Sequence, residues 1–304
     1  MFSEYEHMIN DKKIKEMDKM ELWVATEKIH GTNLSFICRG TDEIVGCRRH
    51  GILKNGEYFM NYEKILEKYK KDMLGINEEI KKEYKDLNQI QIYGELFGGN
   101  YNGKKENGSI KIQKGIDYIP NNDYMVFDIK IMLNSGEIFY YDFDKLIKLL
   151  SVFELKLVPI IKIDVIDEIL KLDPVFESMV YMQYGLPKIK GNNAEGYVIK
   201  MIKGENRSIF KYKNPSFNEI KMERVELAPK VKNRYISIIL NYVCENRFNN
   251  VKTKLVNEKE IYDALYEDLM VDFLEDNSEI SENELNECKK IVKNVIKNRV
   301  DKWI

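Results

Sequence analysis

Residues 25–36 read ATEKIHGTNLSF, and this stretch places Lys28 between two runs of strand-forming residues. The run before it, residues 22–26 (LWVAT), and the run that begins at Leu34 have the apolar and β-branched composition of short strands. Gly31 allows either a positive φ or a close approach of backbone. An amine at such a junction is a candidate nucleophile, although a solvated lysine at the end of a strand has the same local sequence.

Length and composition limit what Lys28 can belong to. A chain of 304 residues can form one large domain and a smaller one. Hydrophobic residues make up 44% and charged residues 32%, which is typical of a soluble globular protein with a core. The amino-terminal sequence lacks the apolar core of a signal peptide, and no apolar run is long enough for a membrane helix. We therefore expect a cytoplasmic protein that does not bind membranes.

The four cysteines are Cys38, Cys47, Cys244 and Cys288, and they form no CxxC pair. Neither a zinc site nor a disulfide framework is indicated, which fits a reducing intracellular compartment.

Charge is distributed unevenly along the chain, although its net value is only −2. Residues 211–254 contain ten Lys or Arg and four Asp or Glu, whereas residues 258–287 contain one Lys and twelve acids. The low net charge argues against a general coat protein for nucleic acid. The asymmetry predicts a basic surface backed by an acidic one, or two oppositely charged helices that pair with each other.

The first two thirds of the chain have the pattern of an α+β domain with antiparallel strands. Two hairpins are expected, over residues 123–143 and 195–214, because turn residues separate paired apolar runs. Residues 61–87 have helical spacing of apolar residues, with an interruption expected at Gly75. A second helix is expected to begin with Asp142 as its cap.

After Pro215 the pattern is helical throughout. In the last helix, Ser281 and Glu284 have the spacing of a capping box. Pro229 interrupts the helical pattern, so we place the domain boundary there, with one domain over residues 1–228 and another over 229–304.

Lysine followed by x-x-Gly is common in this chain, since Lys105 and Lys188 begin the same pattern. Only Lys28 follows an apolar strand and continues as His-Gly-x-Asn. Further polar motifs follow in order: Arg49 in CRRHG, with Arg48 as the alternative, Glu95 in YGELFGG, Phe127 in MVFDI, Glu195 and Lys200 in EGYVIK, and Lys211 and Lys213 in FKYKN.

These six elements resemble the motifs of the covalent nucleotidyltransferases, over residues 20–215. His30 makes the sequence similar to the RNA ligase 2 family in particular, the nick-sealing RNA ligases of phage type, because DNA ligases and mRNA capping enzymes usually have Asp there. The resemblance implies an antiparallel-sheet nucleotidyltransferase domain, ATP-grasp-like, followed by a small all-helical domain.

The resemblance also implies the chemistry. Lys28 would attack the α-phosphorus of ATP to form lysyl-AMP, AMP would pass to the 5′-phosphate of an RNA strand, and a 3′-hydroxyl would then close the strand. Mg²⁺ or Mn²⁺ would be the metal, held by Glu195 directly or through water. The implied nucleotide-binding residues are Glu27, Ile29, His30, Asn33, Arg49, Glu95, Phe127, Lys200, Lys211 and Lys213. The expected partner is RNA with 5′-phosphate and 3′-hydroxyl ends, and we expect a monomer.

The chemistry of lysine agrees with these roles. A lysine amine ordinarily has a pKa of about 10.4 and attacks only when neutral, so burial, nearby cations or a bound metal must favour its deprotonation. In a strand, Lys211 and Lys213 lie on one face while Phe210 and Tyr212 lie on the other. Two neighbouring ammonium groups repel each other unless an anion lies between them, and a triphosphate is such an anion.

Two other classes of protein remain as alternatives. One is another covalent nucleotidyltransferase, a DNA ligase or a GTP-dependent capping enzyme, but those relatives normally carry a β-barrel where this chain has a helical pattern. The other is a non-catalytic nucleic-acid-binding protein, and the presence of all six elements argues against it.

Overall fold

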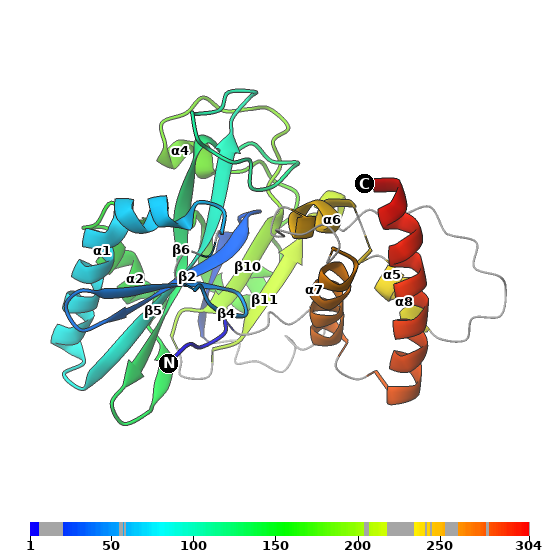
Figure 1. Cartoon of the computed structure of the whole chain (residues 1–304). Helices are drawn as coiled ribbons and strands as arrows, with labels where there is room; N and C mark the ends of the chain where they lie inside the picture. Colours follow the sequence, from blue (N-terminus) through cyan, green and yellow to red (C-terminus); the bar gives the residue numbers. More distant parts are fainter. Residues whose placement is uncertain are drawn as a thin grey trace. The chain divides into compact units, whose positions relative to one another are not determined.

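A computed structural model describes most of the chain (Figure 1). The described residues are 1–5, 21–54, 57, 59–203, 207–217, 234–240, 242–243, 245–252, 261–277 and 280–303. The chain divides into two compact units, Met1–Pro215 and Ser216–Ile304. The domain boundary expected at residues 228–229 lies outside the described residues.

One sheet of the first unit has four strands in the order β11-β10-β1-β9. These strands are β1 (Leu22–Glu27), β9 (Ile160–Val165), β10 (Gly196–Met201) and β11 (Ile209–Lys213). All its pairings are antiparallel. The expected hairpin over residues 195–214 is therefore confirmed, and its first strand lies beside β1, which leads into Lys28.

The second sheet has the order β4-β3-β2-β5-β6-β7, and β8 pairs in parallel with β6. Its strands are β2 (Thr32–Arg39), β3 (Glu43–Arg48), β4 (Gly51–Ile52), β5 (Leu87–Asn100), β6 (Ile119–Leu133), β7 (Ile138–Tyr140) and β8 (Lys156–Leu157). The β6–β7 pairing is the other expected hairpin. The α+β class with antiparallel sheets is therefore confirmed, with one short parallel pair.

Helix α1 (Tyr62–Glu83) buries one face against the second sheet, because Ile65, Tyr69, Met73 and Ile80 recur at helical spacing. The interruption expected at Gly75 was wrong, since the helix continues through it.

The reason for a glycine at position 75 is packing. A Cβ atom at Gly75 would lie 2.6 Å from the ring of Phe153, so no larger residue fits there without movement of that ring.

Helix α2 (Phe143–Leu150) begins after Asp142 as expected, but Asp142 makes no side-chain capping hydrogen bond. The carboxylate instead lies 3.7 Å from Lys145 as an ion pair within the first turn.

Two short helices, α3 (Ile166–Ile169) and α4 (Val180–Gln183), complete the first unit. Two hydrophobic clusters hold it together. The larger joins the second sheet to α1 and α2, and the smaller packs Trp23, Tyr197 and Phe210 of the four-stranded sheet against α3.

The described helices of the second unit are α5 (Arg234–Leu240), α6 (Glu245–Lys252), α7 (Ile261–Asp276) and α8 (Glu282–Trp303). They share one hydrophobic cluster. The capping box at the start of α8 is confirmed, because Glu284 N donates to Ser281 Oγ and Ser281 N donates to Glu284 Oε2. Within the described residues, no helix has the length and apolarity needed to cross a membrane.

The charge asymmetry of the carboxyl-terminal region has a structural counterpart in Arg247 on α6. Its guanidinium contacts Asp268 at 2.6 Å and Asp272 at 2.7 Å, both on α7. For Arg247, therefore, the structure shows pairing between oppositely charged helices rather than an exposed basic surface.

Candidate active site

Lys28 lies directly after β1, beside the start of β10. Its backbone N–H donates to the carbonyl of Gly196, at 2.9 Å, which extends the β1–β10 ladder by one bond. Its side-chain Nζ lies 2.8 Å from Oε2 of Glu195, the residue before β10. Strand pairing therefore brings together the two residues that the sequence singled out as nucleophile and metal-site carboxylate.

Glu195 is the centre of a cationic cluster. Besides Lys28, it contacts His30 Nδ1 at 3.2 Å through Oε2 and Lys213 Nζ at 3.5 Å through Oε1. The residue is only 4% exposed. Burial opposes its ionisation, but the charge of Lys28, together with His30 and Lys213, outweighs burial and holds the pKa of Glu195 far below its ordinary value.

Glu95 reaches the same turn from β5. Its Oε1 accepts a hydrogen bond from Gly31 N at 3.2 Å, and its backbone pairs with Asn33 across the β2–β5 ladder. Burial and the neighbouring charge of Glu195 raise the pKa of Glu95 to about 8, against the opposing effect of Lys28. The two neighbouring carboxyl groups therefore differ in their affinity for a proton, which is raised at Glu95 and lowered at Glu195.

Gly31 is required by close packing. A Cβ atom at this position would lie 2.3 Å from the carbonyl oxygen of Leu96 and 2.8 Å from the Glu95 side chain. Of the two reasons for a glycine considered from sequence, close backbone approach is the one observed.

The structure separates the two candidate arginines. Arg48 is exposed and forms an ion pair of 2.8 Å with Glu57. Arg49 is also exposed, and its charge contributes to lowering the pKa of Glu95. Arg49 stays the predicted site arginine.

Glu27 and Ile29 flank the nucleophile but point elsewhere. The Glu27 carboxyl group accepts hydrogen bonds from Ser178 Oγ at 2.6 Å and from Met179 N at 2.7 Å, and the residue is 1% exposed. Ile29 is 4% exposed. The side chains of both residues are therefore buried, so any nucleotide contact from them would come from their backbone.

Lys200 contacts the backbone of Phe127. Its Nζ donates to the carbonyl of Phe127 at 2.5 Å and to Asp128 Oδ2 at 3.0 Å, and burial lowers its pKa to about 8. Asp128 is also paired with Arg207, and both cations are buried. Lys200 therefore holds the backbone of Phe127, and its hydrogen-bond partners are Phe127 and Asp128 rather than Glu195.

Sequence reasoning missed Tyr5. Its ring meets the partly exposed ring of Phe127 edge to face, with centroids 4.8 Å apart, and its hydroxyl donates to Asp128 Oδ2 at 2.5 Å. The ring of Tyr5 also contacts the rings of Tyr93 and Tyr140. A tyrosine in a polar amino-terminal segment gives no pattern from which this contact could be predicted.

Strand β11 has the expected alternation. Phe210 and Tyr212 pack on the face of the four-stranded sheet that contacts α3, where the rings of Tyr212 and Tyr197 stack with centroids 5.0 Å apart. Lys211 and Lys213 therefore project from the opposite face, and Lys213 reaches Glu195.

Two further residues hold the turn after Lys28. The hydroxyl of buried Tyr118 accepts a hydrogen bond from His30 N at 2.8 Å, and Gln113 Nε2 donates to the carbonyl of Gly31 at 3.1 Å. Both come from the segment between β5 and β6. Their roles were not predicted, because they depend on contacts across more than 80 residues.

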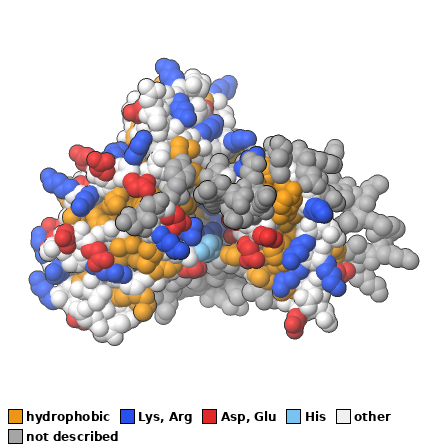
Figure 2. Space-filling view, viewed as in Figure 1, with side chains coloured by type: hydrophobic (Ala, Val, Ile, Leu, Met, Phe, Trp, Pro, Cys, Tyr) orange, Lys and Arg blue, Asp and Glu red, His pale blue; other side chains and the backbone are white. Residues whose placement is uncertain are grey.

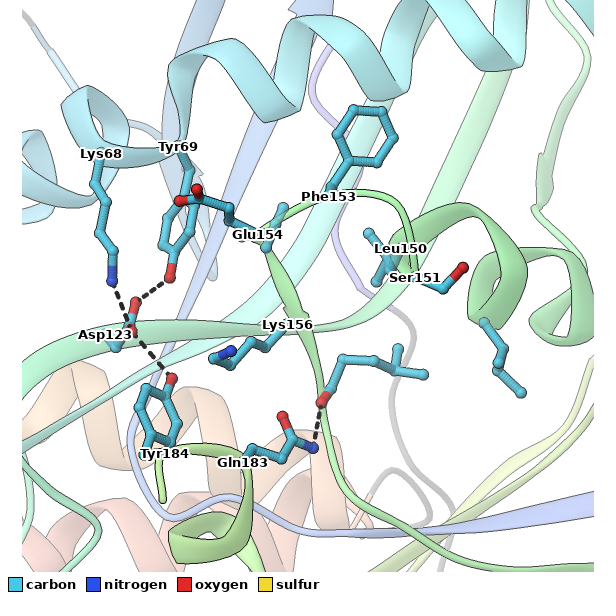
Figure 3. Close-up of a pocket in the computed structure, with 13 residues that line it drawn as sticks. Lys68, Tyr69, Asp123, Leu150, Ser151, Phe153, Glu154, Lys156, Gln183 and Tyr184 are labelled. Carbon is cyan, nitrogen blue, oxygen red and sulfur yellow. Dashed lines mark hydrogen bonds and ion pairs between the residues drawn. The ribbon is translucent and has the colours of Figure 1, made fainter. Parts of the chain in front are cut away.

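A separate pocket of about 570 Å³ lies between α1 and the segment around β8 (Figure 3). None of the predicted site residues lines it. Asp123 within it accepts hydrogen bonds from Lys68 at 2.8 Å, Tyr69 at 2.7 Å and Tyr184 at 3.0 Å. This buried carboxylate has its acceptor capacity filled by protein, which indicates a structural role.

Within the described residues, no group of three or more His, Cys, Asp or Glu side chains could enclose a metal. Glu195 nevertheless suits a cation, since it stays ionised while buried and already attracts three basic side chains. A divalent ion that relies on water and substrate phosphates needs only one or two such carboxylates.

Comparison with known proteins finds RNA ligases. Trypanosoma brucei brucei RNA-editing ligase 2, mitochondrial, is 25% identical over 324 aligned residues, which cover 84% of this chain and 77% of that protein. RNA-editing ligase 1, mitochondrial, from the same organism is also 25% identical, over 84% of this chain and 70% of that protein.

Among solved structures, a Naegleria gruberi RNA ligase mutant with ATP and Mn is 19% identical, with a TM-score of 0.49. That match covers 71% of this chain and 57% of the Naegleria chain. The model of the RNA ligase family matches residues 21–213, which include all six motifs. The predicted family and enzyme class are thereby confirmed: this chain belongs to the RNA ligase family.

Proposed function

We propose that the protein joins a 3′-hydroxyl and a 5′-phosphate RNA end at nicks in duplex or bridged RNA, with ATP as the source of AMP. The observation that carries the proposal is the contact between Lys28 and Glu195 at the paired ends of β1 and β10. A nucleophilic amine, a carboxylate that stays ionised and a strand with two lysines are together what transfer of a nucleotidyl group requires.

In the first step, Lys28 Nζ gives up a proton and forms a bond to the α-phosphorus of ATP, and pyrophosphate leaves. Lys211 and Lys213 are suited to the phosphates of ATP, because ammonium groups fixed on one strand face can stabilise the charge that builds on the leaving group. Phe127 offers a partly exposed ring for the adenine, held by Lys200 and Tyr5.

Glu95 supports binding of the sugar. Its pKa is raised to about 8, and a carboxyl group that carries a proton can both donate to and accept from a ribose hydroxyl. Asn33 lies opposite it in the ladder and provides an amide on the same side.

In the later steps, AMP passes from Lys28 to the RNA 5′-phosphate, and the 3′-hydroxyl attacks that phosphate with release of AMP. His30 shares Glu195 with Lys28, so it lies where a group can orient the incoming phosphate. When bound, Mg²⁺ or Mn²⁺ would neutralise phosphate charge. Glu195 would hold that ion, directly or through water.

We also propose that residues 1–228 form the adenylyltransferase domain, with an ATP-grasp-like arrangement of its sheets, and that residues 229–304 form a helical domain used for RNA. The division into Met1–Pro215 and Ser216–Ile304 supports two units, and all six motifs lie in the first.

Incubation of the protein with α-labelled ATP or GTP and Mg²⁺ tests the proposal. We expect a covalent label from ATP, and sealing of nicked RNA by the labelled protein. Label from GTP alone would indicate a capping enzyme, and absence of label from both nucleotides would favour a binding protein without ligase chemistry.

A further inference from the structure

Two loops of the first unit form one projection. Residues 101–117 follow β5, residues 185–192 follow α4, and together we call them the lysine lobe. Asp117 N donates to Asn192 Oδ1 at 2.9 Å, and Asn192 Nδ2 donates back to the Asp117 carbonyl at 2.7 Å. The hydroxyl of Tyr101 donates to the carbonyl of Pro187. These hydrogen bonds join the two loops into a single surface, seen beside α4 at the top of Figure 1.

The lysine lobe is joined directly to the catalytic turn. Gln113, a lobe residue, donates to the carbonyl of Gly31 at 3.1 Å. Lys114 is the next residue, so its Cα lies about 3.8 Å from that of Gln113. Lys190 precedes Glu195 by five residues, which limits their separation to about 18 Å. These two lysines therefore lie within one turn of duplex nucleic acid, roughly 34 Å, of the reacting residues.

The charges of the lobe are only partly neutralised. Lys111 pairs with Asp117 at 3.3 Å, and Lys188 pairs with Glu177 at 2.5 Å. Four exposed lysines have no ion-pair partner among the described residues, namely Lys104, Lys105, Lys114 and Lys190. Figure 2 shows this projection with more Lys and Arg side chains than acidic ones.

The lobe also lacks a means of reading bases. Tyr101 is its single aromatic residue, and it is 5% exposed, with its hydroxyl engaged by Pro187. Contact with single-stranded bases commonly uses exposed aromatic rings, whereas lysines contact phosphates without regard to sequence. An anionic backbone fits this surface better than unpaired bases do.

We propose that the lysine lobe is a docking surface for the sugar-phosphate backbone of the RNA substrate, next to the end that receives AMP. This inference rests on the proposed function. It assigns Lys104, Lys105, Lys114 and Lys190 to RNA binding, separately from the nucleotide-handling lysines. Through Gln113, the lysine lobe also contacts the turn that carries Lys28 and His30.

The test compares two variants of the full chain with equal changes of net charge. In the lobe variant, Lys104, Lys105, Lys114 and Lys190 are changed to Glu. In the control, four exposed lysines in and just after α1 that have no ion-pair partner among the described residues are changed to Glu: Lys70, Lys71, Lys81 and Lys85. A Lys→Gln version of the lobe variant is the alternative if charge reversal prevents folding.

Binding to a nicked RNA duplex is measured between 50 and 200 mM salt, and lysyl-AMP formation is measured without RNA. We expect the lobe variant to form lysyl-AMP at the wild-type rate. Its RNA affinity should fall by tenfold or more. The slope of log K against log salt should become less steep by about 3.6, since four phosphate contacts that contribute about 0.9 each are lost. The control should retain the wild-type slope.

An unchanged slope in the lobe variant would overturn the inference, and so would equal loss in both variants, because net charge alone would then account for the effect. Unchanged RNA binding would leave a protein partner as the ligand of this surface. Failure of the wild-type protein to form lysyl-AMP would instead contradict the proposed function, so the two failures are distinguishable.

Discussion

Lys28 and Glu195 are 167 residues apart in the chain, yet their side chains form an ion pair of 2.8 Å. The contact orients the amine of Lys28 before substrate arrives. An amine that donates to a carboxylate must leave that contact before it can attack. Glu195 would then keep His30 and Lys213 as neighbours.

Lys28→Ala should abolish covalent attachment of AMP, because Lys28 is the amine that the end of β1 places beside Glu195 and the proposed nucleophile. The fold should persist, since Glu195 keeps His30 and Lys213 as partners. Transfer of label from α-labelled ATP measures the first effect, and circular dichroism the second. Normal labelling of the variant would contradict the assignment. Sealing of pre-adenylated RNA should survive, because that step needs no lysyl-AMP.

Lys211→Ala and Lys213→Ala should each slow lysyl-AMP formation by on the order of a hundredfold, because removal of one fixed contact to a developing anion costs about 3 kcal/mol. Single-turnover labelling gives the rate. Lys85→Ala, an exposed lysine beyond α1, is the control and should retain the wild-type rate. Near-normal rates in both variants would mean that this face of β11 does not contact phosphates.

Gly75→Ala should destabilise the protein by about 1–3 kcal/mol, because the added methyl group meets the ring of Phe153 at 2.6 Å. Replacement of glycine by alanine inside a helix ordinarily raises the stability of the protein, so the expected sign is reversed here. In a Phe153→Ala background the same change should stabilise by up to about 1 kcal/mol. Denaturant unfolding measures all four proteins, and a stabilising effect in the wild-type background would show that Phe153 moves aside freely.

Glu27→Gln should remove a pH dependence of stability. Burial raises the pKa of Glu27 to about 7, from an ordinary value near 4.5. The folded state thus binds the proton more tightly than the unfolded state. The stabilising contribution is complete below about pH 4.5 and is lost as the pH rises to about 7.

The difference in unfolding free energy between wild type and Glu27→Gln should therefore change by on the order of 3 kcal/mol across that range. Denaturation at pH 4.5, 6 and 7.5 measures it. A constant difference would show that Glu27 is ionised throughout.

A fragment that ends near residue 230 should form lysyl-AMP but fail to seal nicked RNA, because the six motifs precede residue 215 while the basic segment extends to 254. Arg247 is excluded from that expected RNA contact, since Asp268 and Asp272 engage it. Sealing of nicks by the folded fragment at the full rate would contradict a role for the helices. If the fragment aggregates, charge-reversal variants of the intact chain answer the same question.

The nucleotide motifs were predictable because strand pairing depends on local patterns of apolar residues. The alternation in β11 and the junction after β1 could both be deduced from spacing alone. The family could be predicted because each of its motifs occupies a few neighbouring positions, and the family model matches residues 21–213, which contain them.

Contacts between distant segments were not predictable. Three residues reach the site from loops or from the amino-terminal segment, namely Tyr5, Gln113 and Tyr118. In such segments no periodic pattern of residues indicates where a side chain will point. Gly75 was misread because propensity treats glycine as a helix breaker, whereas here tertiary packing against Phe153 requires it.

The pairing of β1 with β10 also determines when the four-stranded sheet can form during synthesis. Residues 22–27 cannot pair with residues 196–201 until the ribosome has made the latter, which at 5–20 residues per second takes on the order of 10–35 s. During that interval the strand that carries Trp23 and Val24, both fully buried in the finished protein, has no partner on that edge. The nascent chain is thus prone to aggregation until the hairpin of β10 and β11 has left the ribosome. Because apolar association weakens on cooling, expression at low temperature should improve its yield.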